Sequence, residues 1–282
     1  MQRAPMPNWN LENRTALITG AASGIGRALA VGLAARGCNL ALADRNVAGL
    51  EETERLIATN RVRISRHPLD VADRDAIAAL PAAVEAAHGG LDVLINNAGV
   101  ALGGTFEDVT EADFEWLFEI NFWGVVRMTR AFLPLLRAQP EARIVNLSSL
   151  YGLIAPPGQT AYSASKFAVR GFSQALRHEL AGTAIGVTVV HPGGVATSVA
   201  DSARLPAHMT AEEAARGRAA ANRMLKLAPE RAAEIILAAV ERRQGRVLVG
   251  SDAKLIALIE RLVPVSYWNV IQKLLPRDRA AT

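Results

Sequence analysis

The sequence has very little cysteine: Cys38 is the single cysteine among 282 residues. One thiol excludes an internal disulfide and any cysteine-based metal cluster, and it indicates a reducing compartment such as the cytoplasm. Cys38 begins an apolar run that ends at Ala43, where a buried, inert thiol is expected. The five histidines are dispersed without metal-ligand spacing, so no metal site is predicted. This argues against a zinc-dependent alcohol dehydrogenase.

Long apolar runs and clusters of one charge are also missing. No stretch reaches about 18 uncharged apolar residues, so no membrane-spanning helix is expected. Residues 1–13 lack the apolar segment of a secretory signal. The formal net charge is +4, but the basic residues form no long run and no aromatic stacking motif accompanies them. We therefore predict a soluble cytoplasmic protein without a nucleic acid partner.

What the sequence does contain, from Arg14 onward, is an alternation of short β-rich runs with longer helical patterns. This alternation predicts right-handed βαβ units and an α/β fold. The expected architecture is a Rossmann-type doubly wound parallel sheet of about seven strands with helices on both faces. Strands are expected at 14–19, 38–43, 62–67, 92–96, 143–148, 185–191 and 246–250, and helices at 24–36, 46–59, 73–88, 111–138, 159–182 and 229–243.

No repeat or low-complexity linker interrupts this alternation, so residues 1–282 are predicted to form a single domain with a core at about 12–250. Residues 194–226 depart from the pattern and are interpreted as a substrate-lid insertion. Thr210 and Glu213 form a capping-box signature there, which predicts a helix from Ala211 to Lys226.

An apolar tail, residues 251–282, follows the last predicted strand. Its bulky residues fall at helical spacing, and we interpret it as packing over the substrate site or against another subunit. A peripheral membrane contact through residues 253–275 is the alternative, because aromatic and basic side chains suit a lipid headgroup layer. The residues concerned are Tyr267, Trp268, Val270, Ile271, Lys273, Leu274, Leu275, Arg277 and Arg279.

The motif TGAASGIG at residues 19–26 follows the first predicted strand and opens the first helix. Its glycines permit a tight turn that lets backbone amides approach a pyrophosphate, although an ordinary strand-to-helix turn is the alternative. Asp44 ends the second strand, where a carboxylate binds an adenosine ribose and repels a 2′-phosphate. NAD is therefore predicted over NADP. Arg45 keeps NADP open, since a guanidinium can pair with that phosphate. Asp44 could also be a helix N-cap, a role that is compatible with ribose binding.

Tyr162 and Lys166 lie four residues apart in a predicted helix, so they share one face. An ammonium beside a phenol favours the phenolate, which makes the pair a candidate for proton transfer. Tyrosine titrates near 10, so we expect Lys166 and a cationic nicotinamide to lower the pKa of Tyr162. This spacing alone occurs by chance on many helices.

Six elements together resemble the short-chain dehydrogenases/reductases over roughly residues 12–250. They are TGAASGIG at 19–26, NNAG at 96–99, Asn121, Ser149, YSASK at 162–166 and PGGVAT at 192–197. The resemblance implies that Asn121 holds a water in a proton relay, Ser149 binds the substrate oxygen, Tyr162 is the general acid/base and Lys166 supports it. Residues and resemblance together predict cofactor contacts from Gly20, Ser23, Gly24, Ile25, Gly26, Asp44, Arg45, Asp70, Val71, Asn97, Ala98, Gly99, Tyr162, Lys166, Pro192, Gly193, Val195 and Thr197.

We therefore predict an NAD(P)-dependent oxidoreductase that interconverts a hydrophobic secondary alcohol and its ketone by hydride transfer. An apolar substrate is expected because the predicted pocket walls are apolar; they are Val100, Ala101, Leu102, Leu150, Leu153 and Ile154. Two alternatives stay open: a dinucleotide-binding redox sensor without turnover, and a lyase or epimerase of the same family. The resemblance also implies a homodimer or homotetramer.

Overall fold

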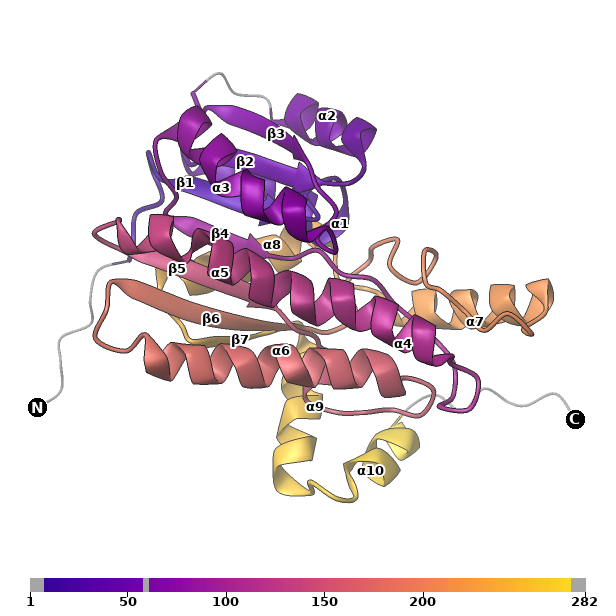
Figure 1. The fold of residues 1–282 in the computed structure, drawn as a ribbon. Coiled ribbons are helices and arrows are strands. Elements are labelled where there is room, and N and C mark those ends of the chain that lie inside the picture. Colours follow the sequence, from indigo (N-terminus) through magenta and orange to yellow (C-terminus); the bar gives the residue numbers. More distant parts are fainter. Residues whose placement is uncertain (1–7, 58–60, 275–282) are drawn as a thin grey trace, which may run out of the picture.

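The computed structural model describes residues 8–57 and 61–274, which fold around one seven-stranded sheet (Figure 1). The strand order is β3-β2-β1-β4-β5-β6-β7, and every pairing is parallel. The order reverses between β1 and β4, which is the switch point of a doubly wound sheet. The strands are β1 (Thr15–Thr19), β2 (Asn39–Asp44), β3 (Ile64–Pro68), β4 (Val93–Asn96), β5 (Ala142–Leu147), β6 (Ile185–Pro192) and β7 (Arg246–Val249). The predicted fold class is confirmed, and each strand lies within two residues of its predicted bounds.

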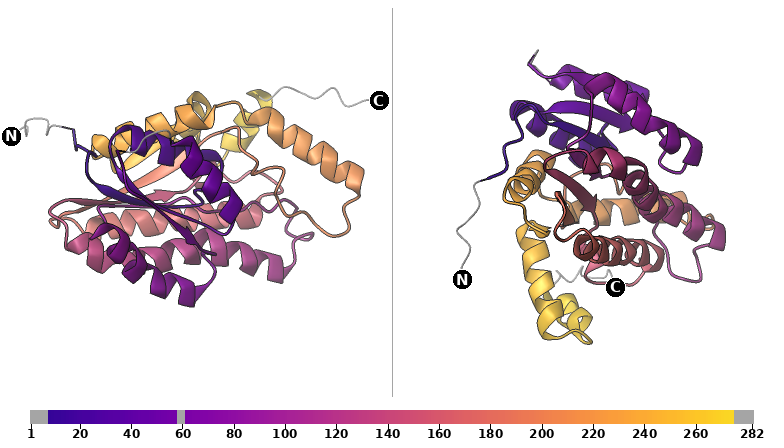
Figure 2. Two further views of the ribbon diagram at one scale, coloured as in Figure 1. Left: turned by 90° about the horizontal axis from the view of Figure 1, so that it is seen from above. Right: turned by 60° about the vertical axis from the view of Figure 1, so that its left-hand side comes forward.

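Helices cover both faces of the sheet (Figures 1 and 2). One apolar core joins the sheet to α1, α2 and α8, and a second joins it to α3, α5 and α6. Strands β1, β4 and β5 are buried along their whole length, as central strands covered on both sides must be. The helices are α1 (Gly24–Ala35), α2 (Val47–Leu56), α3 (Arg74–His88), α4 (Glu111–Phe118), α5 (Gly124–Arg137), α6 (Thr160–Glu179), α7 (Ala211–Met224), α8 (Pro229–Glu241), α9 (Ser251–Leu262) and α10 (Tyr267–Leu274).

The prediction of a single continuous helix at 111–138 is wrong in one respect. A π-helical turn, Glu119–Trp123, separates α4 from α5. Such a turn inserts one extra residue into the helix and is frequent at functional sites. Here it contains the candidate residue Asn121.

The insertion contains the predicted helix as α7, and the capping box of Thr210 and Glu213 is present. None of the residues of α7 is buried. The preceding segment is held at Arg204, whose guanidinium lies 3.7 Å from the centre of the Trp116 ring and 2.6 Å from Asp113. The role of the insertion as a substrate lid stays a prediction.

The tail forms a helical hairpin, α9–α10, that projects from the body of the protein (Figures 1 and 2). Its inner face packs on Leu150, Leu153 and Ile154, while its exposed residues combine apolar side chains with charged ones such as Lys254 and Arg261. Six of the thirteen exposed large hydrophobic side chains in the described residues belong to it: Leu255, Leu258, Leu262, Val265, Val270 and Leu274. The predicted residues Leu275, Arg277 and Arg279 lie outside the described part of the chain. Within that part, no helix has the length and apolar character needed to cross a membrane.

Candidate active site

The glycine-rich loop between β1 and α1 has the backbone conformation that its sequence predicts. Gly20 and Gly24 have φ values of 69° and 52°, which L-residues with a side chain rarely adopt. A Cβ on Gly26 would lie 2.0 Å from the Gly20 carbonyl oxygen, so only glycine fits. The loop thus leaves the N-terminus of α1 open to an anion, with Ser23 exposed and Ile25 half-buried beside it.

The NNAG segment after β4 holds the glycine-rich loop in place by hydrogen bonds. Asn97 donates from its side chain to the Thr19 carbonyl (2.9 Å), and the Thr19 hydroxyl accepts the backbone N–H groups of Asn97 and Ala98 at 3.0 Å each. On the opposite side, the Thr197 methyl group would lie 3.0 Å from a Cβ on Gly24. The predicted pyrophosphate loop, the NNAG segment and the PGGVAT segment are therefore neighbours.

Asp44 lies at the end of β2 and is half-buried. Its carboxylate accepts the backbone N–H groups of Ala22 (3.1 Å) and Asn46 (2.9 Å). The alternative of Asp44 as an N-cap is wrong, because Asn46 caps α2. A carboxylate has about four acceptor positions, so two remain for ribose hydroxyls. Arg45 is exposed and has no ion pair within the described residues.

Arg27 is a basic residue of this region that sequence reasoning missed. Its guanidinium bonds to the Ala22 carbonyl and to the Thr53 hydroxyl at 3.0 Å, so it stabilises the glycine loop from below. Asp70 and Val71, in the loop that follows β3, complete the predicted nucleotide half of the site. Asp70 is exposed, and Val71 is 7 % exposed.

Asn121 is fully buried in the π-helical turn. Its side-chain oxygen accepts the Val100 N–H at 2.8 Å, and its amide donates to the Val100 carbonyl at 3.0 Å. A Cβ on Gly99 would lie 3.2 Å from the Asn121 oxygen and 3.4 Å from the Lys166 ammonium. Asn121 and Lys166 therefore flank one small space that a glycine keeps open.

Ser149 follows β5 and begins the short 3₁₀ turn Leu150–Gly152. Its hydroxyl accepts the N–H of Tyr151 at 3.1 Å, and its carbonyl lies 2.9 Å from Nδ1 of His191. Burial lowers the pKa of His191 to about 4, so the ring is neutral and donates this bond. Ser148 points elsewhere, since its hydroxyl donates to the carbonyl of Lys166 at 2.8 Å.

Tyr162 and Lys166 share one face of α6, as predicted. The Lys166 nitrogen lies 5.7 Å from the centre of the Tyr162 ring and donates to the Leu147 carbonyl at 3.2 Å. Burial lowers the pKa of Lys166 to about 8. For Tyr162, burial raises the pKa to about 12, and a hydrogen bond with Ser149 opposes this only in part. The expectation that Lys166 lowers the pKa of Tyr162 is therefore not met in the protein alone, where Tyr162 is held protonated.

The PGGVAT segment begins at the end of β6 with Pro192 and Val195 buried and Gly193 half-buried. Sequence reasoning missed the residue that holds it: Asp252, the second residue of α9. Its carboxylate accepts the Gly194 N–H at 2.7 Å, and a Cβ on Gly193 would lie 2.2 Å from the same oxygen. The tail thus directly contacts the PGGVAT segment, which is predicted to contact the cofactor.

The predicted apolar walls are divided between two clusters. Leu150, Leu153 and Ile154 pack against the hairpin, whereas Leu102 packs near Tyr162.

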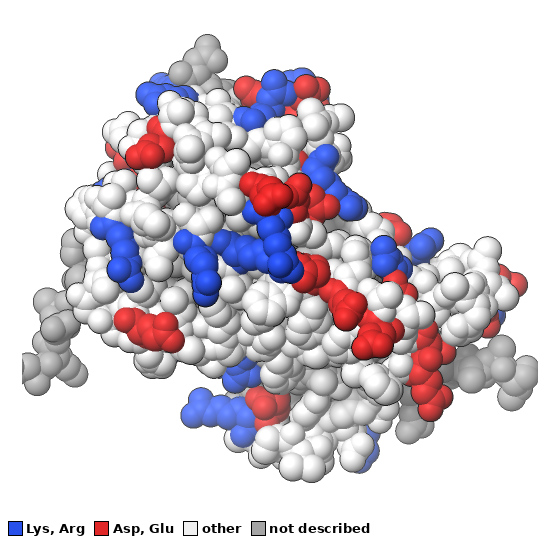
Figure 3. Space-filling model, in the orientation of Figure 1, with Lys and Arg blue, Asp and Glu red and all other residues white. Residues whose placement is uncertain are grey.

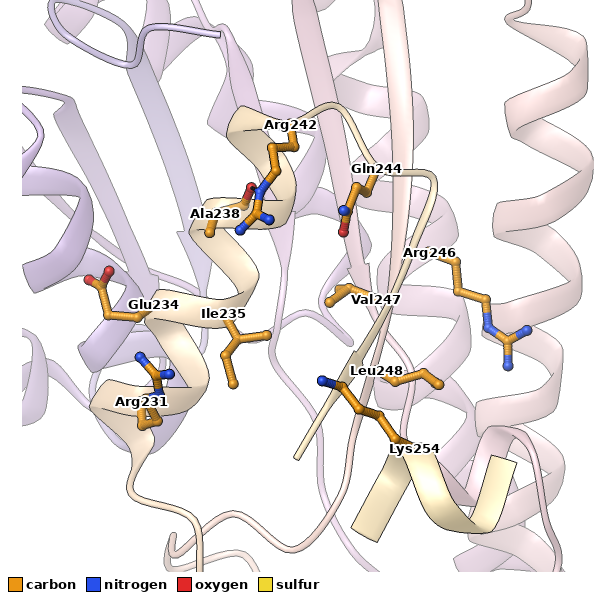
Figure 4. Close-up of a pocket in the computed structure, with 10 residues that line it drawn as sticks. All are labelled: Arg231, Glu234, Ile235, Ala238, Arg242, Gln244, Arg246, Val247, Leu248 and Lys254. Atoms are coloured by element: carbon orange, nitrogen blue, oxygen red, sulfur yellow. Dashed lines mark hydrogen bonds between the residues drawn. The ribbon is translucent and has the colours of Figure 1, made fainter. Parts of the chain in front are cut away.

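A separate cavity of about 560 Å³ lies between α8, β7 and Lys254 (Figure 4). No predicted site residue lines it. Acidic side chains gather along α4, with basic ones beside them (Figure 3). No group of three or more potential metal ligands occurs in residues 8–57 and 61–274.

Comparison with known proteins identifies the family of the chain. The model of the short chain dehydrogenase family matches residues 14–207. This chain belongs to the short-chain dehydrogenases/reductases. It is 43% identical over 265 residues to SadH of Mycobacterium tuberculosis, which is named as a proposed oxidoreductase, covering 93% of this chain and 95% of that protein.

Two solved structures of this family extend the comparison. A short-chain dehydrogenase/reductase from Burkholderia phymatum in complex with NAD has a TM-score of 0.81 and 31% identity, and the match covers 97% of this chain and 100% of that chain. A metagenomic short-chain oxidoreductase in complex with NADP has a TM-score of 0.69 and 30% identity, covering 86% and 98%. The protein is thus a member of an oxidoreductase family.

Proposed function

We propose that this protein interconverts a hydrophobic secondary alcohol and its ketone, with a nicotinamide dinucleotide as cofactor and Tyr162 as general acid/base. The observation that carries the proposal is the convergence of Ser149, Tyr162 and Lys166 at the carboxyl ends of β4 and β5, beside Gly99 and Asn121. Relatives with NAD and with NADP support the cofactor class.

The protonation state of Tyr162 suits ketone reduction. With its pKa raised to about 12 by burial, the phenol carries a proton at neutral pH that it can donate to a carbonyl oxygen as negative charge develops there. The Ser149 hydroxyl, which interacts with Tyr162, would donate a second hydrogen bond to the same oxygen. Lys166 would hold the ribose hydroxyls of the cofactor and assist reprotonation of Tyr162.

Alcohol oxidation requires the opposite state, a Tyr162 phenolate that accepts the hydroxyl proton. The bound cofactor supplies the hydride acceptor, and the positive charge of its oxidised nicotinamide favours that phenolate. Asn121 would hold a water near Lys166 to carry protons to solvent. The Asn121 side chain is fixed for this by its two bonds to Val100.

We further propose a preference for NAD. The carboxylate of Asp44 has acceptor positions left for the adenosine ribose, and its charge repels a 2′-phosphate. The guanidinium of Arg27 already bonds to the Ala22 carbonyl and the Thr53 hydroxyl. Arg45 is exposed beside Asp44 and is the residue that could pair with a 2′-phosphate if NADP binds.

A panel of secondary alcohols and ketones assayed with both NAD(H) and NADP(H) tests this function. We expect continuous production or consumption of NADH, with a higher kcat/KM than for the phosphorylated cofactor. Cofactor binding without turnover of any alcohol or ketone would favour a redox sensor. Conversion of a substrate with no net change in NADH would favour a lyase or epimerase.

A further inference from the structure

Tyr151 lies between the catalytic candidates but has no role in the reaction described above. Its backbone N–H donates to the Ser149 hydroxyl, and its ring meets the Tyr162 ring edge to face, with centres 6.0 Å apart and planes at 83°. Tyr151 therefore contacts the ring of Tyr162 and the hydroxyl of Ser149 directly.

The hydroxyl of Tyr151 is available to a ligand. Among the residues that the structure describes, it makes no hydrogen bond, whereas the Tyr267 hydroxyl accepts the Ala155 N–H at 3.0 Å. It is also absent from the buried polar atoms that lack a partner, so solvent reaches it. Burial of the ring raises the pKa of Tyr151, which keeps the hydroxyl protonated and able to donate.

The hairpin holds this side chain in place. Tyr151 packs against the cluster that Leu150, Leu153 and Ile154 form with the inner face of α9–α10. The bond between Ala155 and Tyr267 ties the same turn to α10. A phenol whose ring is locked by packing loses little entropy when its hydroxyl binds a ligand.

We propose that Tyr151 is a specificity residue: its hydroxyl binds a second hydrogen-bonding group of the substrate, while its ring contacts the apolar skeleton. The proposal rests on the proposed alcohol/ketone chemistry and narrows its substrate class. The preferred substrate is an apolar secondary alcohol or ketone with a second oxygen or nitrogen some bonds away from the reacting carbon. Chains with a single functional group are poorer substrates.

The test compares wild type with Tyr151→Phe on 2-nonanone and on nonane-diones in which the second carbonyl occupies successive positions. One hydrogen bond to a neutral group corresponds to about a 10-fold change. We expect kcat/KM for the best dione to fall about 10-fold in Tyr151→Phe and that for 2-nonanone to change less than about twofold. Equal effects on both ketones, or no effect on either, would overturn the proposal.

Tyr267→Phe is the matched control. It removes the acceptor of the Ala155 N–H and loosens the whole turn, so it should lower kcat/KM for 2-nonanone and for the dione by the same factor. If Tyr151→Phe also lowers kcat/KM for both ketones by the same factor, Tyr151 has only a structural role. Turnover of 2-nonanone by the wild type reports separately on the proposed function. Without turnover, calorimetric binding of both ketones to the protein with NADH compares the two variants, and unchanged affinities again reject the role of the hydroxyl.

Discussion

Lys166→Met is predicted to abolish turnover and at the same time to stabilise the protein. Lys166 is only 5 % exposed, and burial lowers its pKa from 10.5 to about 8. At about 1.4 kcal/mol for each pH unit, holding this charge costs the native state about 3 kcal/mol at neutral pH. Methionine has a similar length and no charge, so it removes that cost.

The stability gained by removing the buried charge is partly offset by a lost hydrogen bond. The variant loses the hydrogen bond from Lys166 to the Leu147 carbonyl, which is worth about 1 kcal/mol. The net increase in the free energy of unfolding at pH 7 should be about 2 kcal/mol, which for a chain of this size corresponds to about 4 °C in Tm.

The pH dependence gives this prediction a second readout. The pKa of Lys166 is lower in the native state, so between pH 8 and 10.5 the unfolded wild type binds more protons than the native protein. Wild-type stability therefore rises with pH through that window relative to the variant. The advantage of Lys166→Met is complete below pH 8 and is lost by pH 10.5.

Urea unfolding at pH 7 and pH 10 measures both effects, and Lys254→Met is the control. Lys254 is exposed, so its replacement should leave the free energy of unfolding within about 0.5 kcal/mol. A Lys166→Met protein less stable than wild type at pH 7, or an advantage independent of pH, would refute the claim that burial of this charge destabilises the native state.

Three further predictions concern the cofactor and the tail. Asp44→Ala should lower the NAD-to-NADP ratio of kcat/KM at least about 10-fold by removing the repulsion of the 2′-phosphate, and an unchanged ratio contradicts the role of Asp44. Asp252→Ala, which frees the Gly194 N–H, should raise the Kd for NADH about 10-fold in fluorescence titration, whereas Glu260→Ala should not change it. The membrane contact is tested by replacing Leu255, Leu258 and Leu262 with serine. If the tail contacts a membrane, the wild type should co-sediment with anionic liposomes, whereas the variant should stay in the supernatant. Equal recovery of the two proteins in the supernatant would reject the membrane contact.

Much of the fold and of the site follows from local sequence. The apolar strands and the glycine-rich turn are dictated by nearest neighbours along the chain, which is why β1 and the loop from Gly20 to Gly26 were predictable. The parallel order then brings the ends of β1, β4, β5 and β6 to one edge of the sheet. Residues that follow those ends, such as Asn97 and Ser149, are therefore expected along the same edge from the strand order alone.

Features that depend on distant contacts were not predictable. The π-helical turn at Asn121 is stabilised by bonds to Val100, 21 residues away. Asp252 lies 58 residues from Gly194, and no motif links them. The raised pKa of Tyr162 is a consequence of burial by several segments, whereas the sequence shows only the favourable lysine four residues away.

Tyr162→Phe tests the central claim most directly, because it removes one hydroxyl and leaves the ring in its packing. Steady-state turnover of the best alcohol and ketone is measured beside the Kd for NADH. The acid/base role of Tyr162 predicts a loss of kcat greater than about 100-fold with a Kd that changes less than about threefold. A variant that keeps more than about a hundredth of the wild-type rate would contradict that role.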